Sequence, residues 1–228
     1  MPKTRSSAIQ VDRSIMGSIP THRVKRLDRF IQQWRINKIR RYVPQGGRVL
    51  DIGCADGALF RQMRRIGSGV GVDPALVQSV RTGAFELIAG SIPDDLAPAQ
   101  FDVATMLAVV EHLPEDVISE MRDQCVRMLK PGGLVLITVP SPTVDNILKA
   151  LIWLRLVGNM SFDQHHGFDV RTVPARFSGT GLTLATHKRF QLGLNHLFVF
   201  RRVDTSPEAV VGALATQQGR TTHARQRT

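Results

Sequence analysis

The stretch VLDIGCADG, residues 49–57, determines how the rest of the sequence is interpreted. Its first four residues are predicted to form a buried strand, and the small residues at positions 53, 55 and 57 predict a tight turn into a helix. Small residues let the backbone of such a turn approach a ligand closely, and free N–H groups at the start of the helix can bind a carboxylate. In open α/β sheets, ligands bind at this place, beyond the carboxyl end of a strand.

Strand and helix patterns alternate through the sequence on both sides of this turn. The predicted strands are residues 48–52, 69–72, 86–89, 101–106 and 134–139, and the predicted helices are residues 22–43, 58–66, 74–80, 114–130 and 172–178. The strand at 134–139 has almost no polar alternation, which is typical of a strand buried on both faces of a parallel sheet. Residues 182–189 and 194–201 lie too close together for a helix between them, so they predict an antiparallel hairpin at the sheet edge. The whole pattern predicts an α/β fold, a doubly wound sheet with helices on both faces.

The chain of 228 residues is long enough for one domain with a substantial core. We expect this domain at 22–203, with an N-terminal helical cap at 22–43 and a substrate-side insertion at 140–170. Residues 1–21 are a polar, basic leader and residues 204–228 a polar tail, and we expect both to be flexible or disordered.

The cysteine and hydropathy patterns favour some cellular compartments for this protein over others. Two cysteines, Cys54 and Cys125, are too few for a disulfide framework, which favours a reducing compartment such as the cytoplasm, and we interpret both as packing residues. The longest apolar stretch, residues 144–157, contains three charged residues and is shorter than the ~20 residues that cross a bilayer. The Arg/Ser-rich start lacks the apolar segment of a secretory signal, although its composition would permit an organelle transit peptide.

The formal charge of +11 belongs mainly to the first part of the chain. Residues 1–48 contain 12 Lys and Arg against two Asp, whereas residues 49–203 contain 15 basic and 15 acidic groups. A neutral central region disfavours a polyanion as the main ligand. Three interpretations of the basic segment stay open: a solvated face, contact with an anionic membrane or an acidic acceptor, and binding of nucleic acid. Phe30, Trp34 and Tyr42 follow a helical spacing within this segment, which favours burial in the core over stacking on bases.

An acidic residue at the end of the second strand narrows the choice of ligand. Asp73 lies 20 residues after Gly53, where a carboxylate can accept hydrogen bonds from both hydroxyls of a ribose. The turn reads Gly-x-Ala-x-Gly, one residue shorter than the dinucleotide fingerprint G-x-G-x-x-G, and the acids Asp51 and Asp56 lie beside it. Acidic groups suit a cationic ligand and disfavour a pyrophosphate. S-adenosylmethionine, with its ammonium and sulfonium groups, is therefore a better candidate than NAD.

Four segments, in this order along the chain, resemble the motifs of class I S-adenosylmethionine-dependent methyltransferases. They are VLDIGCADG, the strand that ends at Asp73, FDVATMLAVVEHLPED at 101–116 and LKPGGLVLITVP at 129–140. The resemblance covers about residues 45–203 and is closest to the small-molecule branch that includes the ubiquinone and menaquinone biosynthesis methyltransferases. It implies a Rossmann-like, seven-stranded sheet whose last strand is antiparallel, and S-adenosyl-L-methionine as the cofactor.

The resemblance also implies a set of cofactor-binding residues: Asp51, Gly53, Cys54, Ala55, Gly57, Asp73, Ser91, Ile92 and Leu107. The residues of the turn would surround the methionine part, and Asp73 would bind the ribose. Ser91 and Ile92 would lie along the adenine, with Leu107 at the far side of the pocket. Two residues depart from the family pattern, because Ala55 replaces the usual middle glycine and Ser91 replaces an acid that often contacts the adenine amine.

Methyl transfer is an in-line displacement at a carbon that the positive sulfur already activates, so the protein mainly aligns the reactants and excludes water. A general base is needed only where the acceptor loses a proton. The candidate bases are His112, just past the fourth strand, and His165 and His166, before the last predicted helix; a role in loop structure is the alternative for each. The spacing of Asp163 and these two histidines is not distinctive of a metal site, so no metal is expected.

The sequence predicts a methyltransferase that acts on a small, hydrophobic molecule by O- or C-methylation. Residues 144–156 form a helical pattern that is apolar around most of its girth. Such a helix either packs on the domain or on a second copy, or forms a lid or membrane-facing element that admits a lipid-like or quinone-like acceptor. Two alternatives stay open: an RNA methyltransferase that uses the basic segment, and a cofactor-binding module without turnover. Against nucleobase methylation, residues 107–110 are not an Asn/Asp-Pro-Pro-aromatic turn and neither cysteine follows a proline.

Overall fold

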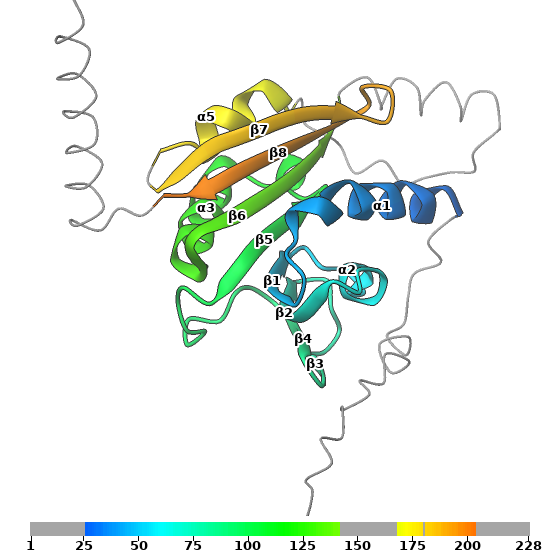
Figure 1. The fold of residues 1–228 in the computed structure, drawn as a ribbon, viewed down its shortest axis with the longest axis vertical. Coiled ribbons are helices and arrows are strands. Elements are labelled where there is room, and N and C mark those ends of the chain that lie inside the picture. Colours follow the sequence, from blue (N-terminus) through cyan, green and yellow to red (C-terminus); the bar gives the residue numbers. More distant parts are fainter. Residues whose placement is uncertain (1–25, 142–167, 180, 204–228) are drawn as a thin grey trace, which may run out of the picture.

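The computed structural model describes residues 26–141, 168–179 and 181–203, which form one sheet with helices on both of its faces (Figure 1). The strands are β1 (Gly47–Ile52), β2 (Ile66–Asp73), β3 (Val80–Thr82), β4 (Phe85–Ala89), β5 (Phe101–Leu107), β6 (Leu129–Pro140), β7 (Leu182–Phe190) and β8 (Asn195–Arg202). The helical segments are α1 (Arg26–Ile39), η2 (Arg40–Tyr42), α2 (Ala58–Gln62), η3 (Val110–His112), α3 (Glu115–Met128), η4 (Val170–Thr172) and α5 (Val173–Phe177). The strand order across the sheet is β3-β4-β2-β1-β5-β6-β8-β7.

The centre of the sheet is parallel, and antiparallel pairs lie at its two ends. Strands β4, β2, β1, β5 and β6 run parallel to one another, β8 runs antiparallel between β6 and β7, and β3 is antiparallel to β4. The predicted doubly wound fold and the predicted hairpin of the last two strands are confirmed. Two details differ: the described sheet has eight strands instead of seven because β3 is added at one edge, and β8 lies inside the sheet while β7 forms the other edge.

The predicted helix at 74–80 is wrong. The chain turns directly after β2, because the Asp73 carboxylate accepts a hydrogen bond from the backbone N–H of Ala75 (Oδ1 to N, 2.8 Å). The hydroxyl of Ser79 then accepts a hydrogen bond from the backbone N–H of Ala89 in β4 (3.0 Å), which ties the segment to the edge of the sheet. The residues that follow form β3 instead of continuing a helix.

Two hydrophobic cores lie on the two faces of the sheet. Helices α1 and α2 cover one face and bury Ile36, Ile39 and Phe60 there. Helices α3 and α5 cover the other face and bury Ile118 and Phe177. The helix predicted at 114–130 is confirmed as α3. Because the parallel strands all run in one direction between these layers, their carboxyl ends meet at a single edge of the sheet.

The orientation of α1 corrects a second prediction. Its residues Ile36 and Ile39 are buried, whereas Phe30 and Trp34 are 59% and 42% exposed. The two exposed rings pack edge to face, with centroids 5.6 Å apart. The prediction that Phe30 and Trp34 belong to the core is wrong, because a helix with 3.6 residues per turn cannot direct both of these series at the sheet. Tyr42, in η2, packs against the core as predicted.

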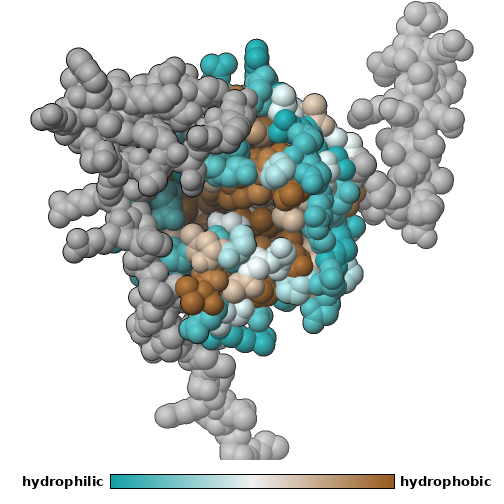
Figure 2. Space-filling view, turned by 180° about the vertical axis from the view of Figure 1, so that it is seen from behind, coloured by the Kyte–Doolittle hydropathy of each residue, from teal (hydrophilic) through white to brown (hydrophobic). Residues whose placement is uncertain are grey.

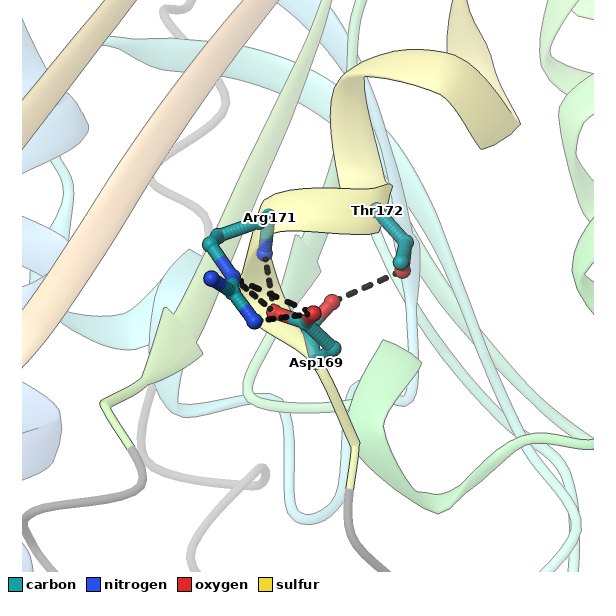
Figure 3. Close-up of polar contacts among 3 residues, drawn as sticks. All are labelled: Asp169, Arg171 and Thr172. Carbon is teal, nitrogen blue, oxygen red and sulfur yellow. Dashed lines mark hydrogen bonds and ion pairs between the residues drawn. The ribbon is translucent and has the colours of Figure 1, made fainter.

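Asp169 organises the short helices that follow residue 167 (Figure 3). Its carboxylate accepts a hydrogen bond from the backbone N–H of Arg171 (2.9 Å) and pairs with the guanidinium of the same residue (Oδ2 to Nη2, 2.9 Å). These bonds lower the pKa of Asp169. The hydroxyl of Thr172 donates to the backbone carbonyl of Asp169 (2.7 Å), and together these contacts cap η4, which continues into α5.

Several predicted features lie outside the described residues: the leader at 1–21, the helix at 144–156 within the predicted insertion, His165, His166 and the tail at 204–228. In the part of the chain that the structure describes, no helix has the length and apolar character needed to cross a membrane.

Candidate cofactor site

The turn after β1 folds over the end of β2 and is held there by its backbone. The N–H groups of Gly53 and Cys54 both donate to the carbonyl oxygen of Val72, at 2.9 and 3.2 Å. Gly53 has φ +74°, and a Cβ at this position would lie 2.4 Å from Cγ2 of Val109, the residue that precedes η3. Glycine is therefore required at this position both for its backbone conformation and for the close approach of the loop after β5.

Asp73 fastens the same turn from the neighbouring strand. Its carboxylate accepts a hydrogen bond from the backbone N–H of Ala55 (Oδ2 to N, 2.7 Å), in addition to the bond from Ala75. Its backbone carbonyl accepts a bond from Gly90 (3.1 Å), which brings the segment before Ser91 to the end of β2. The carboxylate at the end of β2 thus lies beside the turn, as a ribose-binding acid would have to.

The turn forms one side of a cavity of about 290 Å³. Its lining residues are Gln32, Arg35, Ile36, Asp51, Gly53, Cys54, Ala55, Ala58, Leu59, Leu107 and Ala108. Five of the nine predicted cofactor residues are thereby brought together, from Asp51 to Leu107. The other four, Gly57, Asp73, Ser91 and Ile92, do not line this cavity, and Ile92 is buried in the core on the α3 side of the sheet.

Helix α1 supplies lining residues that sequence reasoning missed. Gln32, Arg35 and Ile36 line the cavity together with the residues of the turn. Arg35 lies directly before the buried Ile36, at the border of the buried stripe of α1, but no local pattern marks it as a lining residue. The sequence alone does not show which end of the sheet α1 crosses.

Asp51 is an acid held in an unfavourable environment. It is 4% exposed at the end of β1, and Thr105 on the neighbouring strand donates a hydrogen bond to it (Oγ1 to Oδ1, 2.6 Å). Burial raises the pKa of Asp51 to about 7; the bond from Thr105 lowers it and the nearby charge of Asp73 raises it further. A buried carboxyl with this pKa is poised to ionise when a cation binds next to it.

The second acid of the turn has a different role. The carboxylate of Asp56 pairs with the guanidinium of Arg61 and accepts a hydrogen bond from the backbone N–H of Ala58 (3.2 Å). Asp56 therefore stabilises the first turn of α2. The preference for a cationic ligand rests on Asp51 alone.

The two cysteines are free thiols and buried, as predicted for packing residues. Burial raises the pKa of the Cys54 thiol, and the charges of Asp51 and Asp73 raise it further. Burial also raises the pKa of Cys125, to about 12. Both thiols stay protonated near neutral pH and are poor nucleophiles.

Of the three candidate bases, His112 is described. It lies in η3, directly after the loop that closes on Gly53, and its side chain is 45% exposed. Its Nε2 lies 4.0 Å from Oε1 of the buried Glu111. His112 does not line the cavity, and its catalytic role stays a prediction. Among the described residues, no three His, Cys, Asp or Glu side chains lie together in a way that could hold a metal ion.

Comparison with known sequences places the chain in a family. The methyltransferase domain family matches residues 23–188. The chain is 32% identical over 145 residues to the ubiquinone biosynthesis O-methyltransferase of Paraburkholderia phymatum. The aligned region covers 59% of this chain and 62% of that protein. It is 30% identical over 178 residues to the enzyme of the same name from Ralstonia nicotianae, with 73% and 74% covered. The chain spans 53% of the length of a further such relative, from Paracidovorax citrulli.

Solved structures share the fold at low sequence identity. The PH0226 protein of Pyrococcus horikoshii OT3 aligns with a TM-score of 0.60 at 13% identity, over 78% of this chain and 93% of that chain. The N-methyltransferase NodS of Bradyrhizobium japonicum WM9, in complex with S-adenosyl-L-homocysteine, aligns with a TM-score of 0.51 at 17% identity, over 78% and 87%. The sheet order, the turn after β1 and the family match together show that this chain belongs to the class I S-adenosylmethionine-dependent methyltransferases.

Proposed function

We propose that this protein transfers a methyl group from S-adenosylmethionine to a small, hydrophobic, quinone-like acceptor. The observation that carries the proposal is that Asp51 and Arg35 line one cavity, since opposite charges suit the ammonium and carboxylate groups of the methionine part. The relatives named as ubiquinone biosynthesis O-methyltransferases support a quinone-like acceptor and favour methylation at oxygen over carbon.

Each residue of the site would hold a different part of the cofactor. The guanidinium of Arg35 would pair with the carboxylate, and Asp51 would pair with the ammonium. Asp73 would accept hydrogen bonds from the ribose hydroxyls; each of its oxygens already accepts one backbone N–H and has a further lone pair for a second donor. Gly53 would let the turn approach the methionine part without a side chain between them.

The chain's own contribution to catalysis would be alignment and exclusion of water. When bound, the cofactor supplies a methyl group that its sulfonium activates. Residues of the cavity would hold the cofactor in one orientation, and an acceptor bound beside it would react with a low entropic barrier. If the acceptor atom is a hydroxyl oxygen, a base must take its proton. His112 is the candidate among the described residues, and His165 and His166 are the candidates outside them.

One face of the molecule exposes apolar area. Viewed from behind, the molecule is hollowed, and hydrophobic residues gather in the hollow between hydrophilic rims (Figure 2). A hollow of this kind removes apolar area of a ligand from water, which stabilises binding by about 25 cal/mol per Å².

The function can be tested by measuring which acceptor receives an isotope-labelled methyl group. Purified protein is incubated with isotope-labelled S-adenosylmethionine and, separately, with quinol and phenol extracts, lipid extracts and total RNA. We expect label in the quinol or phenol fraction. Label in RNA, with turnover that falls steeply as salt is raised, would favour the RNA methyltransferase instead. Binding of S-adenosylhomocysteine without label in any fraction would favour a binding module without turnover.

Replacing Asp73 by Ala is expected to weaken binding of S-adenosylhomocysteine by ~10- to 100-fold, the scale of lost hydrogen bonds to a charged group. The loss has two causes, because the ribose loses its acceptor and the backbone of Ala55 loses its anchor. Calorimetric titration measures the affinity. Asp73→Asn keeps one acceptor oxygen and should lose less. An Asp73→Ala variant with the affinity of the wild type would show that the ribose binds elsewhere.

We also propose peripheral contact with an anionic membrane, through a surface on α1. The exposed rings of Phe30 and Trp34 on α1 can enter a bilayer interface, and Arg40 and Arg41 in η2, which follows α1 directly, are exposed cations. The excess of Lys and Arg in residues 1–48 adds attraction to anionic lipid. A hydrophobic acceptor dissolved in the bilayer would then lie close to the cavity that α1 helps to close.

This contact is testable because the chain has two tryptophans. In a Trp153→Phe variant, Trp34 is the only one, and its emission should shift to the blue with vesicles that contain about a third of anionic lipid, but not at high salt. Phe30→Ser combined with Trp34→Ser should weaken cosedimentation with these vesicles by ~10-fold or more. Leu184→Thr changes an exposed apolar residue on β7 and is the matched control. It should not weaken cosedimentation with the vesicles. Equal binding by all variants would exclude α1 as the contact.

A further inference from the structure

Helix α1 rests on the turn between β7 and β8. The Nε of Arg35 donates a hydrogen bond to Oδ1 of Asn195, the first residue of β8, at 3.3 Å. One turn further along α1, the Nζ of Lys38 lies 5.5 Å from the ring centroid of Phe190, the last residue of β7. Two cationic side chains of α1 therefore hold the two ends of this turn, and one of them, Arg35, also lines the cofactor cavity.

The side-chain amide of Asn195 is oriented by a second amide. Asn195 is 3% exposed, and its Nδ2 donates to Oε1 of Gln191, which is 8% exposed. Because the NH₂ group of Asn195 is engaged by Gln191, its carbonyl oxygen is directed to Arg35. The amide pair therefore presents a hydrogen-bond acceptor to the Nε of Arg35.

Gln191 and Leu192 are the two central residues of a tight turn, which a hydrogen bond from the N–H of Gly193 to the carbonyl oxygen of Phe190 closes (3.1 Å). Gln191 and Leu192 have φ +53° and φ +56°, in the left-handed region that residues other than glycine rarely adopt. Leu192 is fully exposed, so the conformation does not serve to bury it. Positive φ at both central residues is what a tight hairpin turn of this kind requires. The turn brings Gln191 to Asn195, four residues further along the chain, with which it forms the amide pair.

We propose that Gln191 and Asn195 are positioning residues that aim Arg35 at the carboxylate of the bound cofactor. This inference rests on the proposed function. It gives a role in cofactor binding to the β7–β8 turn, which is separate from the turn after β1. The β7–β8 turn would determine how tightly the amino-acid part of the cofactor binds. It would have no effect on the nucleoside part, which Asp73 and the end of β2 would hold.

Two ligands separate these parts of the cofactor. S-adenosylhomocysteine has the amino-acid group, whereas 5′-methylthioadenosine has the same nucleoside and thioether without it. In an Asn195→Leu variant of the full chain, we expect the affinity for S-adenosylhomocysteine to fall about 10-fold, which corresponds to ~1.4 kcal/mol. The affinity for 5′-methylthioadenosine should stay at the wild-type value. Calorimetric titration of both ligands gives the ratio, which a merely structural role of Asn195 would not change.

A matched control lies on α1 itself. Gln33 and Asn37 form an exposed amide pair (Nε2 to Oδ1, 3.3 Å), and neither residue lines the cavity. Asn37→Leu should leave both affinities unchanged. In an Arg35→Met background, where the guanidinium is gone, Asn195→Leu should cause no further loss of S-adenosylhomocysteine affinity, because the two residues act as one unit.

A second substitution keeps the inference testable if Asn195→Leu does not fold. In Asn195→Asp, the new carboxylate would pair with Arg35 and compete with the carboxylate of the ligand, so S-adenosylhomocysteine alone should bind more weakly. Equal losses for both ligands, or no loss for either, would overturn the inference. A wild-type protein that binds neither ligand would instead contradict the proposed function.

Discussion

Replacing Gly53 by Ala is expected to remove most cofactor binding and to destabilise the protein. The added Cβ would lie 2.4 Å from Cγ2 of Val109, well inside contact distance, and the φ of +74° disfavours any residue with a side chain. Val109 packs against the core and its branched side chain has little freedom to move away. The turn must therefore shift, and with it the N–H groups of Gly53 and Cys54 that bind Val72.

Two costs add in this variant. The left-handed backbone costs ~1 kcal/mol and the steric conflict ~1–3 kcal/mol, so the midpoint of thermal unfolding should fall by about 5–15 °C. The affinity for S-adenosylhomocysteine should fall by ~100-fold or more, since a displacement of about 1 Å in an aligned site has effects of this size. Scanning calorimetry and titration calorimetry measure the two quantities.

Gly46 provides the matched control for Gly53. It has the same φ of +74°, but a Cβ there would meet nothing within 4 Å. Gly46→Ala should therefore show only the backbone cost of ~1 kcal/mol and bind the ligand normally. A Val109→Ala substitution combined with Gly53→Ala should recover part of the lost affinity. If Gly53→Ala binds as tightly as the wild type, the turn does not contact the ligand.

The elements with local, repeated patterns could be predicted from the sequence. The strand and turn at 49–57 could be predicted because small residues follow an apolar segment. Helix α3 could be read because its apolar face is periodic and PGG at 131–133 follows it. The segment at 74–80 could not, because its structure depends on two hydrogen bonds that no periodic pattern indicates. The backbone N–H of Ala75 donates to the Asp73 carboxylate, and the backbone N–H of Ala89 in β4 donates to the hydroxyl of Ser79. A helical pattern of moderate strength is overridden by such contacts.

The candidate site was predictable on one side only. The residues after β1, β2 and β5 follow from the rule that ligands bind at the carboxyl ends of parallel strands. Arg35 and the amide pair of Gln191 and Asn195 do not follow from any local pattern, because Arg35 and Asn195 are 160 residues apart and meet only through the fold. The packing of α1 on the sheet, with Phe30 and Trp34 outward, is likewise a tertiary result.

Replacing Asp51 by Asn is expected to change stability and ligand binding in opposite directions. The pKa of Asp51 is about 7 in the folded protein against an ordinary value of 3.8, because burial penalises its charged form. Between pH 4 and 7 the folded state holds a proton that the unfolded state has released. The stability of the ligand-free protein therefore falls as pH rises through this window, by an amount on the order of 4 kcal/mol, and does not change with Asp51 above it.

Burial lowers the pKa of His187 and of His196, so these residues contribute to the pH dependence of stability with the opposite sign. The quantity to measure is therefore the difference between Asp51→Asn and the wild type, obtained by denaturant unfolding from about pH 4 to 8. We expect the variant to gain stability relative to the wild type as pH rises towards 7. A difference that is independent of pH would show that Asp51 is already ionised in the folded protein at low pH.

The same substitution should weaken the binding of S-adenosylhomocysteine. In the proposed site the ammonium of S-adenosylhomocysteine would pair with ionised Asp51, so the affinity of this ligand for the wild type should fall ~10-fold for each pH unit below 7, as one proton is linked to binding. In Asp51→Asn the affinity should be ~10- to 100-fold lower at pH 8 and nearly independent of pH. Thr105→Val, which removes the hydrogen bond that favours the carboxylate, should move the midpoint of the wild-type profile to higher pH. Protonation of Asp51 would stabilise the ligand-free protein, whereas binding of the ligand would need the ionised form. This combination is expected of a residue that binds a cation and not of one that only packs in the core. Wild-type affinity in Asp51→Asn at pH 8 would therefore remove Asp51 from the cofactor site.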